Sequence, residues 1–105
     1  MKVKQDSREA TRAVNKNGTV FVCEINPEAK EVYLVGEFNN WDPQVDRMVK
    51  RKGAFQKTLY LSPGKYQYKF LIDGVWHTDP TAAEQLPNHV GTMNSVIRVS
   101  DSKSG

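Results

Sequence analysis

The chain has 105 residues, of which 38% are hydrophobic, and its 15 basic and 12 acidic side chains give a formal net charge of +3. This length supports one domain with its own core and excludes two. The charge falls short of the clustered positive surface of a dedicated nucleic-acid-binding protein, and no apolar run approaches the ~20 residues of a membrane span. We therefore expect neither nucleic acid nor a membrane as a partner.

The N-terminus and the cysteine content indicate the compartment. The first residues, Met1 to Asp6, lack the apolar middle of a secretory signal. Cys23 is the only cysteine and alternates with apolar neighbours, so it cannot form an internal disulfide. We expect a cytoplasmic location and a buried, unreactive thiol.

The first 18 residues are polar and end in a turn-forming cluster over 15–18. Asp6 can cap a short helix, but an isolated helix of about ten residues is marginal without docking. We predict a polar N-terminal arm over 1–18, with a short helix as the alternative form, a β-sandwich domain over 19–99 and a polar tail over 100–105.

From Thr19 onwards apolar residues recur at every second position, which is typical of β-strands. The pattern predicts strands over 19–25, 31–36, 53–61 and 95–99. The segments 37–43 and 81–88 are predicted to be loops, because each contains a proline and neither has a clean period. Met48 is expected to reach the core from a short segment.

The clearest predicted element is a β-hairpin over 66–79, whose turn is Asp73-Gly74. An Asp-Gly pair favours a two-residue turn, because both positions require a positive φ angle. Directly opposed residues share a face of the sheet. The expected pairs are Ile72 with Val75, Leu71 with Trp76, and Phe70 with His77.

The two faces of this hairpin differ in polarity. One is a continuous apolar stripe and is predicted to face the core: Tyr66, Tyr68, Phe70 and Ile72. Trp76 shares the other face with Lys69, which places an indole beside an ammonium on a surface exposed to water. Trp41, in the loop 37–43, is a second aromatic side chain outside the core pattern. The simpler interpretation is that Trp76 only covers a sheet edge or packs under a loop.

Six or seven short strands separated by turn signals predict an all-β fold, namely an immunoglobulin-like antiparallel β-sandwich. A small barrel of the oligonucleotide-binding type is the alternative. The expected core residues are Phe21, Tyr33 or Leu34, Phe70, Ile72 and Ile97.

Four motifs together resemble the family 48 carbohydrate-binding module, which is an isoamylase-type early-set domain. They are Val32 to Trp41 (VYLVGEFNNW), Gly64 to Phe70 (GKYQYKF), Asp73 to Trp76 (DGVW) and Gly91 to Ile97 (GTMNSVI). The likeness covers roughly residues 19–99 and is strongest to the glycogen-binding domain of the AMP-activated protein kinase β subunit.

This resemblance implies non-catalytic binding of α-1,4-linked glucans such as glycogen, starch, maltooligosaccharides and cyclodextrins. Trp41 and Trp76 match tryptophans that pack against the sugar chain in the family, and Lys69 matches a lysine that hydrogen-bonds glucose hydroxyls. Thr92 and Asn94 match further polar contacts.

One position departs from the pattern of the family. Val90 stands where kinase-type members carry a leucine that inserts into the open curve of the glucan. A shorter side chain offers less apolar contact there.

The residue chemistry agrees with this interpretation independently of the family. A glucose ring has a flat apolar face and a rim of hydroxyls, so a binding protein needs an aromatic surface for the face and polar groups for the rim. Two indoles, an ammonium, an amide and a hydroxyl stand at positions outside the core pattern.

Catalysis is not expected. A glycosidase uses two carboxyl groups about 5 or 6.5–9.5 Å apart, whereas the acidic residues here belong to turns and a shallow sheet face provides no water-excluding cleft. His77, Asp79 and His89 match no closed metal site by their spacing. We therefore expect no catalytic residue, no metal and no cofactor.

Two other binding functions were weighed. A single-stranded nucleic-acid-binding protein also places aromatics beside lysines, but acidic residues crowd the loops that carry the tryptophans. A protein-interaction sandwich remains the alternative, in which exposed tryptophans contact a partner. That partner would be a glycogen- or starch-metabolising enzyme or a kinase subunit supplied in trans.

Overall fold

The computed structural model describes residues 18–100, and the N-terminal helix suggested by the sequence lies outside this range. The chain order of the elements is β1 (Thr19–Cys23), β2 (Val32–Gly36), the 3-10 helix η2 (Glu37–Asn39), β3 (Asp46–Arg47), β4 (Val49–Arg51), β5 (Ala54–Leu59), β6 (Gly64–Ile72), β7 (Val75–His77), β8 (Glu84–Pro87) and β9 (Met93–Val99). Within this part of the chain, no helix is long and apolar enough to cross a membrane.

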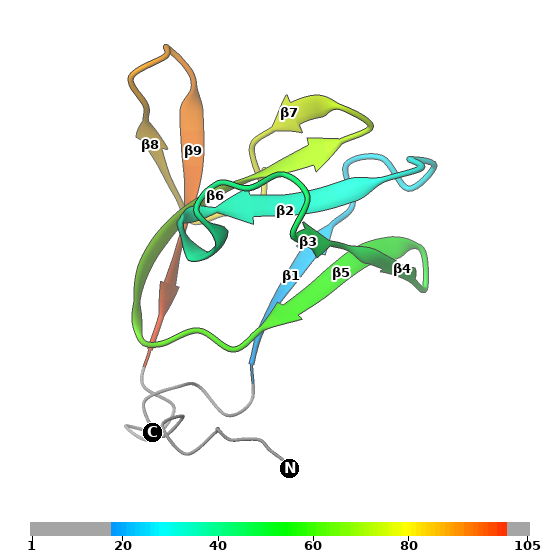
Figure 1. Cartoon of the computed structure of the whole chain (residues 1–105), viewed down its shortest axis with the longest axis horizontal. Coiled ribbons are helices and arrows are strands. Elements are labelled where there is room, and N and C mark those ends of the chain that lie inside the picture. The colour runs from blue at the N-terminus through cyan, green and yellow to red at the C-terminus, as the bar shows by residue number, and fades with distance from the viewer. Residues whose placement is uncertain (1–17, 101–105) are drawn as a thin grey trace.

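The strands form two antiparallel sheets. The small sheet has the order β1-β5-β4, and the large sheet has the order β3-β2-β6-β9-β8 with β7 paired to β6. The two sheets lie in separate layers, with the small sheet below β2 and β6 in the view of Figure 1. The prediction of an all-β antiparallel sandwich is confirmed.

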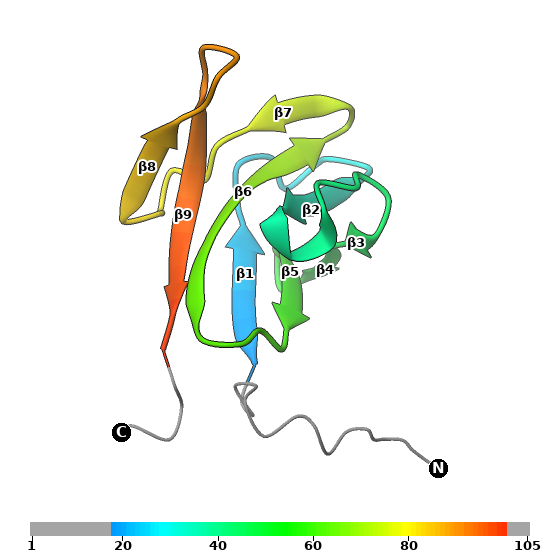
Figure 2. The ribbon, with the colours of Figure 1, turned by 60° about the vertical axis from the view of Figure 1, so that its left-hand side comes forward.

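Strand β6 is the common neighbour within the large sheet. One edge of β6 pairs with β2 along Tyr68–Ile72. Its other edge pairs with β9 along Gly64–Tyr68 and with β7 along Phe70–Ile72. As a result β7 and the β8–β9 pair diverge from β6, as Figures 1 and 2 show.

The hairpin of β6 and β7 has the predicted register. Leu71 pairs with Trp76, and both turn residues have positive φ angles, 46° for Asp73 and 83° for Gly74. The Asp73 carboxylate also accepts hydrogen bonds from the main-chain N–H groups of Lys30 (2.9 Å) and Glu31 (2.8 Å). The turn therefore also holds the connection between β1 and β2, which the sequence pattern did not indicate.

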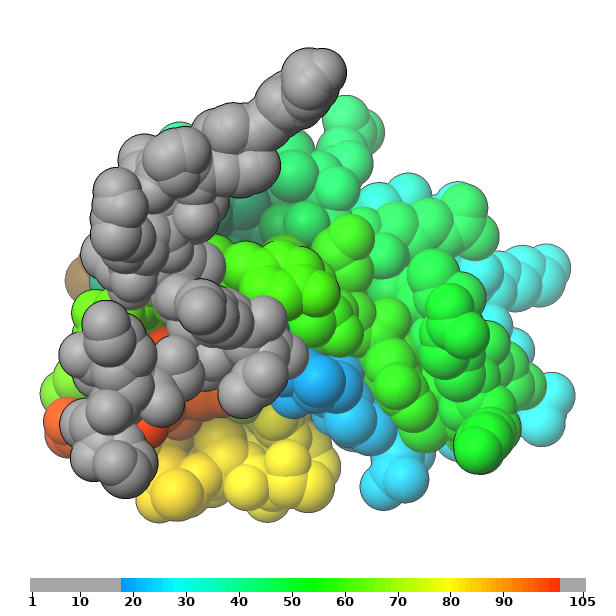
Figure 3. Space-filling view, turned by 90° about the horizontal axis from the view of Figure 1, so that it is seen from below, coloured from blue at the N-terminus to red at the C-terminus, as the bar shows by residue number. Residues whose placement is uncertain are grey.

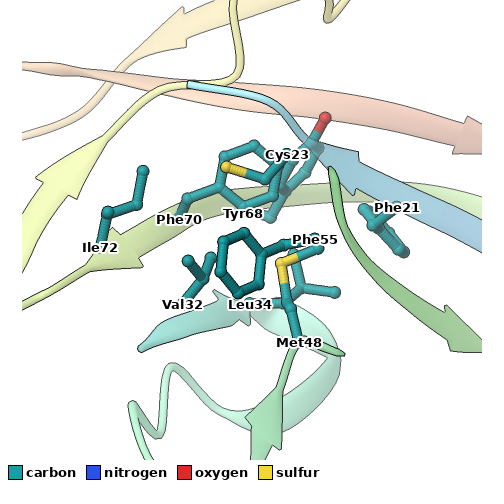
Figure 4. Packing of buried hydrophobic residues seen from close by; sticks show 9 residues of the cluster. All are labelled: Phe21, Cys23, Val32, Leu34, Met48, Phe55, Tyr68, Phe70 and Ile72. Carbon is teal, nitrogen blue, oxygen red and sulfur yellow. The ribbon is translucent and has the colours of Figure 1, made fainter. Parts of the chain in front are cut away.

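The core lies between the two sheets, where nine side chains from both layers converge (Figure 4). These are Phe21, Cys23, Val32, Leu34, Met48, Phe55, Tyr68, Phe70 and Ile72. The predicted core residues belong to this cluster, with Leu34 rather than Tyr33 facing inwards and Ile97 packing against it as a partly buried neighbour. Burial raises the pKa of the Cys23 thiol, so this side chain stays protonated.

Met48 marks the point where the chain passes from one sheet to the other. Strand β3 belongs to the large sheet and β4 to the small sheet, and Met48 is the single residue between them. Its main-chain N–H donates to Val32 O at 2.8 Å, and its side chain is buried in the core. The expectation that Met48 reaches the core is confirmed.

One predicted loop is wrong. Residues 84–87 form strand β8, which pairs with β9. The pattern shows no apolar alternation because β8 is an edge strand whose inner side chain, Gln85, accepts a hydrogen bond from Ser95 Oγ at 3.1 Å. Pro87 lies at the end of this edge strand, where a missing main-chain N–H costs little.

The strands are also shorter at some ends than the pattern suggests. β1 stops at Cys23, β2 begins at Val32, and β5 covers Ala54–Leu59. The last strand is longer than expected, because Met93 and Asn94 already belong to β9.

A buried polar group closes the side of the sandwich beside β9. Tyr68 donates its hydroxyl proton to Asp79 Oδ2 at 2.6 Å, and Asp79 N donates to Ser95 Oγ at 2.7 Å. The other carboxylate oxygen of Asp79 accepts from Thr81 N and Thr81 Oγ1. Burial, followed by the hydrogen bond to Asp79, raises the pKa of the Tyr68 phenol, which keeps it protonated as a donor.

The position of Phe70 generates a stability prediction. This side chain is fully buried among residues of both sheets, so Phe70→Ala should leave a cavity and lower the free energy of unfolding by about 3–5 kcal/mol. Urea titration measures the loss. Val45→Ala, at an exposed loop position, should change the same quantity by no more than about 0.5 kcal/mol; equal losses in the two variants would contradict this packing.

Candidate functional site

The six residues that the sequence predicts as a site line one open hollow of about 430 Å³. They are Trp41, Lys69, Trp76, Val90, Thr92 and Asn94, and the same hollow is lined by Asn88 and His89. These residues come from three separate parts of the chain: the loop after η2, the β6–β7 hairpin and the β8–β9 connection.

Trp41 is held in an irregular turn. Asn40 and Trp41 have φ angles of 57° and 59°, a left-handed conformation that is rare for a bulky side chain and persists only where the surroundings fix it. The main-chain N–H of Trp41 donates to Gly36 O at 2.9 Å. The indole is 38% exposed, so the turn presents it to solvent rather than to the core.

Asn39 supports this turn. Its Oδ1 accepts from Gly36 N at 3.1 Å, and its Nδ2 donates to Leu34 O at 3.0 Å and to Asp46 Oδ2 at 2.8 Å. Gly36 is required there for space, because a Cβ atom on it would lie 2.6 Å from Gln67 O. The end of β2 and the turn that carries Trp41 therefore form one braced unit.

Trp76 and Lys69 lie on the outer face of the large sheet. The register pairs Trp76 with Leu71 across β6 and β7, and Lys69 precedes Leu71 by two residues, so all three share a face. The opposite face of β6 carries buried Tyr68 and Phe70. Trp76 is 48% exposed, as the hairpin register predicts.

The β8–β9 connection supplies the polar side of the hollow. Lys69 Nζ donates to Thr92 Oγ1 at 3.0 Å, which ties this loop to β6. Asn94 Nδ2 donates to Gln67 Oε1 at 3.0 Å. Val90 projects from the same loop with 70% of its surface exposed.

Asn88 and His89 were not singled out from the sequence. Asn88 makes hydrogen bonds to Val90, Thr92 and Asn94. The one available signal was its place directly after Pro87, since asparagine commonly bonds main-chain groups two residues ahead in turns. His89 has no such signal and enters the lining through its position in the loop.

The charges around this hollow suit a neutral ligand. Its lining contains one ammonium, Lys69, and one imidazole, His89, and no carboxylate. The three residues considered for metal binding are not brought together, because Asp79 is buried against Tyr68 whereas His89 lines the hollow. Over residues 18–100 no group of three or more His, Cys, Asp or Glu side chains could hold a metal ion.

A larger hollow, of about 730 Å³, lies between β1 and the segment that leads to β8. Figure 3 shows the blue β1 beside the yellow segment around residue 80. The polar groups at its base, Tyr68 and Asp79, are bonded to each other. The hollow with the two tryptophans is therefore the better candidate, since it combines exposed aromatic surface with polar groups.

Two indoles beside a donor-rich rim form a surface for a molecule with flat apolar faces and peripheral hydroxyls. An indole offers a large rigid face for stacking. The ammonium of Lys69, the hydroxyl of Thr92 and the amide of Asn94 stand at hydrogen-bonding distance from one another's neighbours rather than deep in the protein. The arrangement can bind a ligand from an open side and leaves much of that ligand in water.

Comparisons with known proteins agree with this geometry. A family model described as the glycogen recognition site of AMP-activated protein kinase matches residues 11–104. The rice (Oryza sativa subsp. japonica) protein FLOURY ENDOSPERM 6, chloroplastic, is 37% identical over 91 residues, which is 87% of this chain and 17% of that protein. The mouse (Mus musculus) 5'-AMP-activated protein kinase subunit beta-2 is 38% identical over 73 residues, covering 70% of this chain and 26% of the subunit.

Two further matches extend the comparison. The pig (Sus scrofa) 5'-AMP-activated protein kinase subunit beta-1 is 41% identical over 70 residues, covering 67% of this chain and 55% of that sequence. Among solved structures, a maltogenic amylase from S. marinus superposes with a TM-score of 0.59 and 27% identity, over 77% of this chain and 13% of the amylase chain. This chain thus spans only part of the length of each relative, and it belongs to the family of glycogen-recognition domains represented by AMP-activated protein kinase.

Proposed function

We propose that the chain binds α-1,4-linked glucans, such as glycogen, starch, maltooligosaccharides and cyclodextrins, without acting on them. The observation that carries this proposal is the joint exposure of Trp41 and Trp76 around one hollow. Glucose rings of the ligand stack on the two indoles, while Lys69, Thr92 and Asn94 hydrogen-bond the hydroxyls at the rim. The family membership supports carbohydrate binding in general, and these residue roles are the finer part of the proposal.

The open form of the hollow favours a curved chain. Trp41 approaches from the loop after η2 and Trp76 from β7, so the two rings are supported by different elements. An α-1,4-glucan bends along its length and can follow two separately placed rings, whereas a β-1,4-glucan is straight. Val90, which is apolar and protrudes between these sides, fits the concave side of such a bend.

We propose binding without catalysis because the hollow lacks the groups that hydrolysis needs. Glycoside hydrolysis uses a pair of carboxyl groups across the scissile bond, and the lining has none. The site is also open to water, so it offers no desolvated environment for bond cleavage. The contacts it provides are few and solvent-exposed, which favours modest affinity.

The location of the chain, for which the sequence indicates the cytoplasm, stays a prediction. The name of the rice relative places that protein in the chloroplast.

A second role, docking on a protein, is favoured by an apolar patch on the outer face of the small sheet. Val22 and Val49 both pair with Gln56 from opposite sides, so they share a face. Together with Val20 they are 38–54% exposed. Such a patch, on the other sheet from the hollow, suits a protein partner, which we propose to be a glycogen-metabolising enzyme or a kinase subunit supplied in trans.

Ligand selectivity tests the proposed function directly. In native gels the chain should be retarded by glycogen or amylopectin and should migrate unchanged with cellulose or single-stranded DNA, because curvature and the scarcity of cations around the hollow exclude the latter two. Equal retardation by a straight β-1,4-glucan would contradict the site.

Replacing Trp76 separates the site from the scaffold. Trp76→Ala should weaken β-cyclodextrin binding by about 2 kcal/mol or more in calorimetric titration, because an anchoring aromatic is lost. Its free energy of unfolding should change by less than about 1 kcal/mol, since the indole is half exposed. Phe70→Ala is the matched control and should lose stability instead. A Trp76→Ala protein that binds the dextrin at wild-type strength would show that the site is wrong.

Charged substitutions in the valine patch test the docking role. Val22→Lys and Val49→Lys should abolish co-elution with a purified kinase catalytic subunit or glycogen-metabolising enzyme in size-exclusion chromatography, because each buries an ammonium in the contact. Both variants should bind β-cyclodextrin normally. Co-elution unaffected by either change would exclude this surface.

A further inference from the structure

We propose that Asn88 is the positioning residue of the candidate site and that it fixes the Thr92 hydroxyl as a hydrogen-bond donor to the ligand. The inference rests on the proposed function, because it concerns the polarity of that same site. Asn88 directly follows β8 and lines the hollow together with Thr92.

The side-chain amide of Asn88 is fully used within the loop. Its Oδ1 accepts from Val90 N at 3.0 Å and from Thr92 N at 3.1 Å. Its Nδ2 donates to Thr92 Oγ1 at 2.8 Å and to Asn94 Oδ1 at 3.0 Å. A primary amide has two protons to donate and two lone pairs to accept with, so none remains for a ligand. Asn88 therefore acts on the ligand through its neighbours.

The main chain determines which way the amide points. Two N–H groups, of Val90 and Thr92, face one end of the Asn88 side chain, and that end must be the oxygen. A reversed amide would place its NH₂ group against these two donors and its oxygen against Asn94 Oδ1. The NH₂ group of Asn88 thus faces Thr92 Oγ1.

Thr92 Oγ1 accepts a second hydrogen bond, from Lys69 Nζ at 3.0 Å. A hydroxyl has one proton and two lone pairs, and a lysine ammonium can only donate. Both hydrogen bonds that the Thr92 hydroxyl makes within residues 18–100 are therefore ones in which it accepts. Its own proton is left to donate, and because Thr92 lines the hollow, it donates towards the ligand.

The consequence is a rim that reads acceptor atoms. The Lys69 ammonium uses one of its three protons on Thr92, so both side chains present protons to the hollow. The ligand class that matches is one with closely spaced acceptor oxygens on a neutral frame, as in the hydroxyl and ring oxygens of a glucan.

The variant Asn88→Asp tests this assignment against a purely structural role. A carboxylate keeps the two acceptor contacts with Val90 N and Thr92 N, so the loop remains braced. It can no longer donate to Thr92 Oγ1, and the hydroxyl proton turns to the carboxylate instead of the ligand. We expect the affinity for β-cyclodextrin, measured by calorimetric titration, to fall about fivefold or more, whereas simple bracing of the loop predicts wild-type affinity.

Thr92 supplies the matched controls. Thr92→Val removes the hydroxyl at constant shape and should lose affinity about as much as Asn88→Asp, whereas Thr92→Ser should stay within about twofold of wild type. The double variant Asn88→Asp/Thr92→Val should bind no more weakly than either single variant, because both remove the same donor. If the new carboxylate acted through Lys69 instead, its loss would add to that of Thr92→Val.

The outcomes separate this inference from the proposed function. Wild-type affinity in Asn88→Asp, or additive losses in the double variant, would overturn the donor assignment while Trp76→Ala still abolishes binding. A wild-type chain that does not bind β-cyclodextrin would contradict the proposed function, and the inference would fall with it. Urea midpoints close to wild type in each variant show that affinity, and not folding, has changed.

Discussion

The alternation of side chains along β6 is the constraint on which the rest of the structure depends. Tyr68, Phe70 and Ile72 enter the core between the sheets, and Lys69 and Leu71, between them in sequence, lie on the outer face. Because the period of a strand is two residues, a shift of one residue would exchange these sets completely. The buried rings therefore hold Lys69 in place as firmly as they hold the core together.

The same strand explains where the hollow forms. β2 covers one edge of β6, while β7 and β9 share the other edge and diverge from it. The loop after η2 and the β8–β9 connection come together over the outer face beside this divergence. A binding surface arises there because the sheet itself has no single flat edge.

Short polar side chains hold the irregular segments that regular hydrogen bonding cannot hold. Asn39 braces the turn of Trp41, Asp73 secures the β1–β2 connection, and Asn88 organises the β8–β9 connection. Each accepts hydrogen bonds from main-chain N–H groups that would otherwise lack partners. Rigid loops of this kind lower the entropy lost when a ligand binds, since the contacting groups are already positioned.

The sequence by itself determined the features that depend on local pattern and turn chemistry. The period-two runs predict the strands and the sandwich, and Asp73-Gly74 predicts the hairpin register and hence the outward position of Trp76. Tertiary structure alone decided the rest. β8 has no apolar period because it is an edge strand, Met48 becomes a core residue only because the chain changes sheets there, and Asn88 gains its role from contacts with residues that no local rule ties to it. The convergence of Trp41, Trp76 and Thr92 is likewise non-local, since strand pairing between distant segments sets the distance between them.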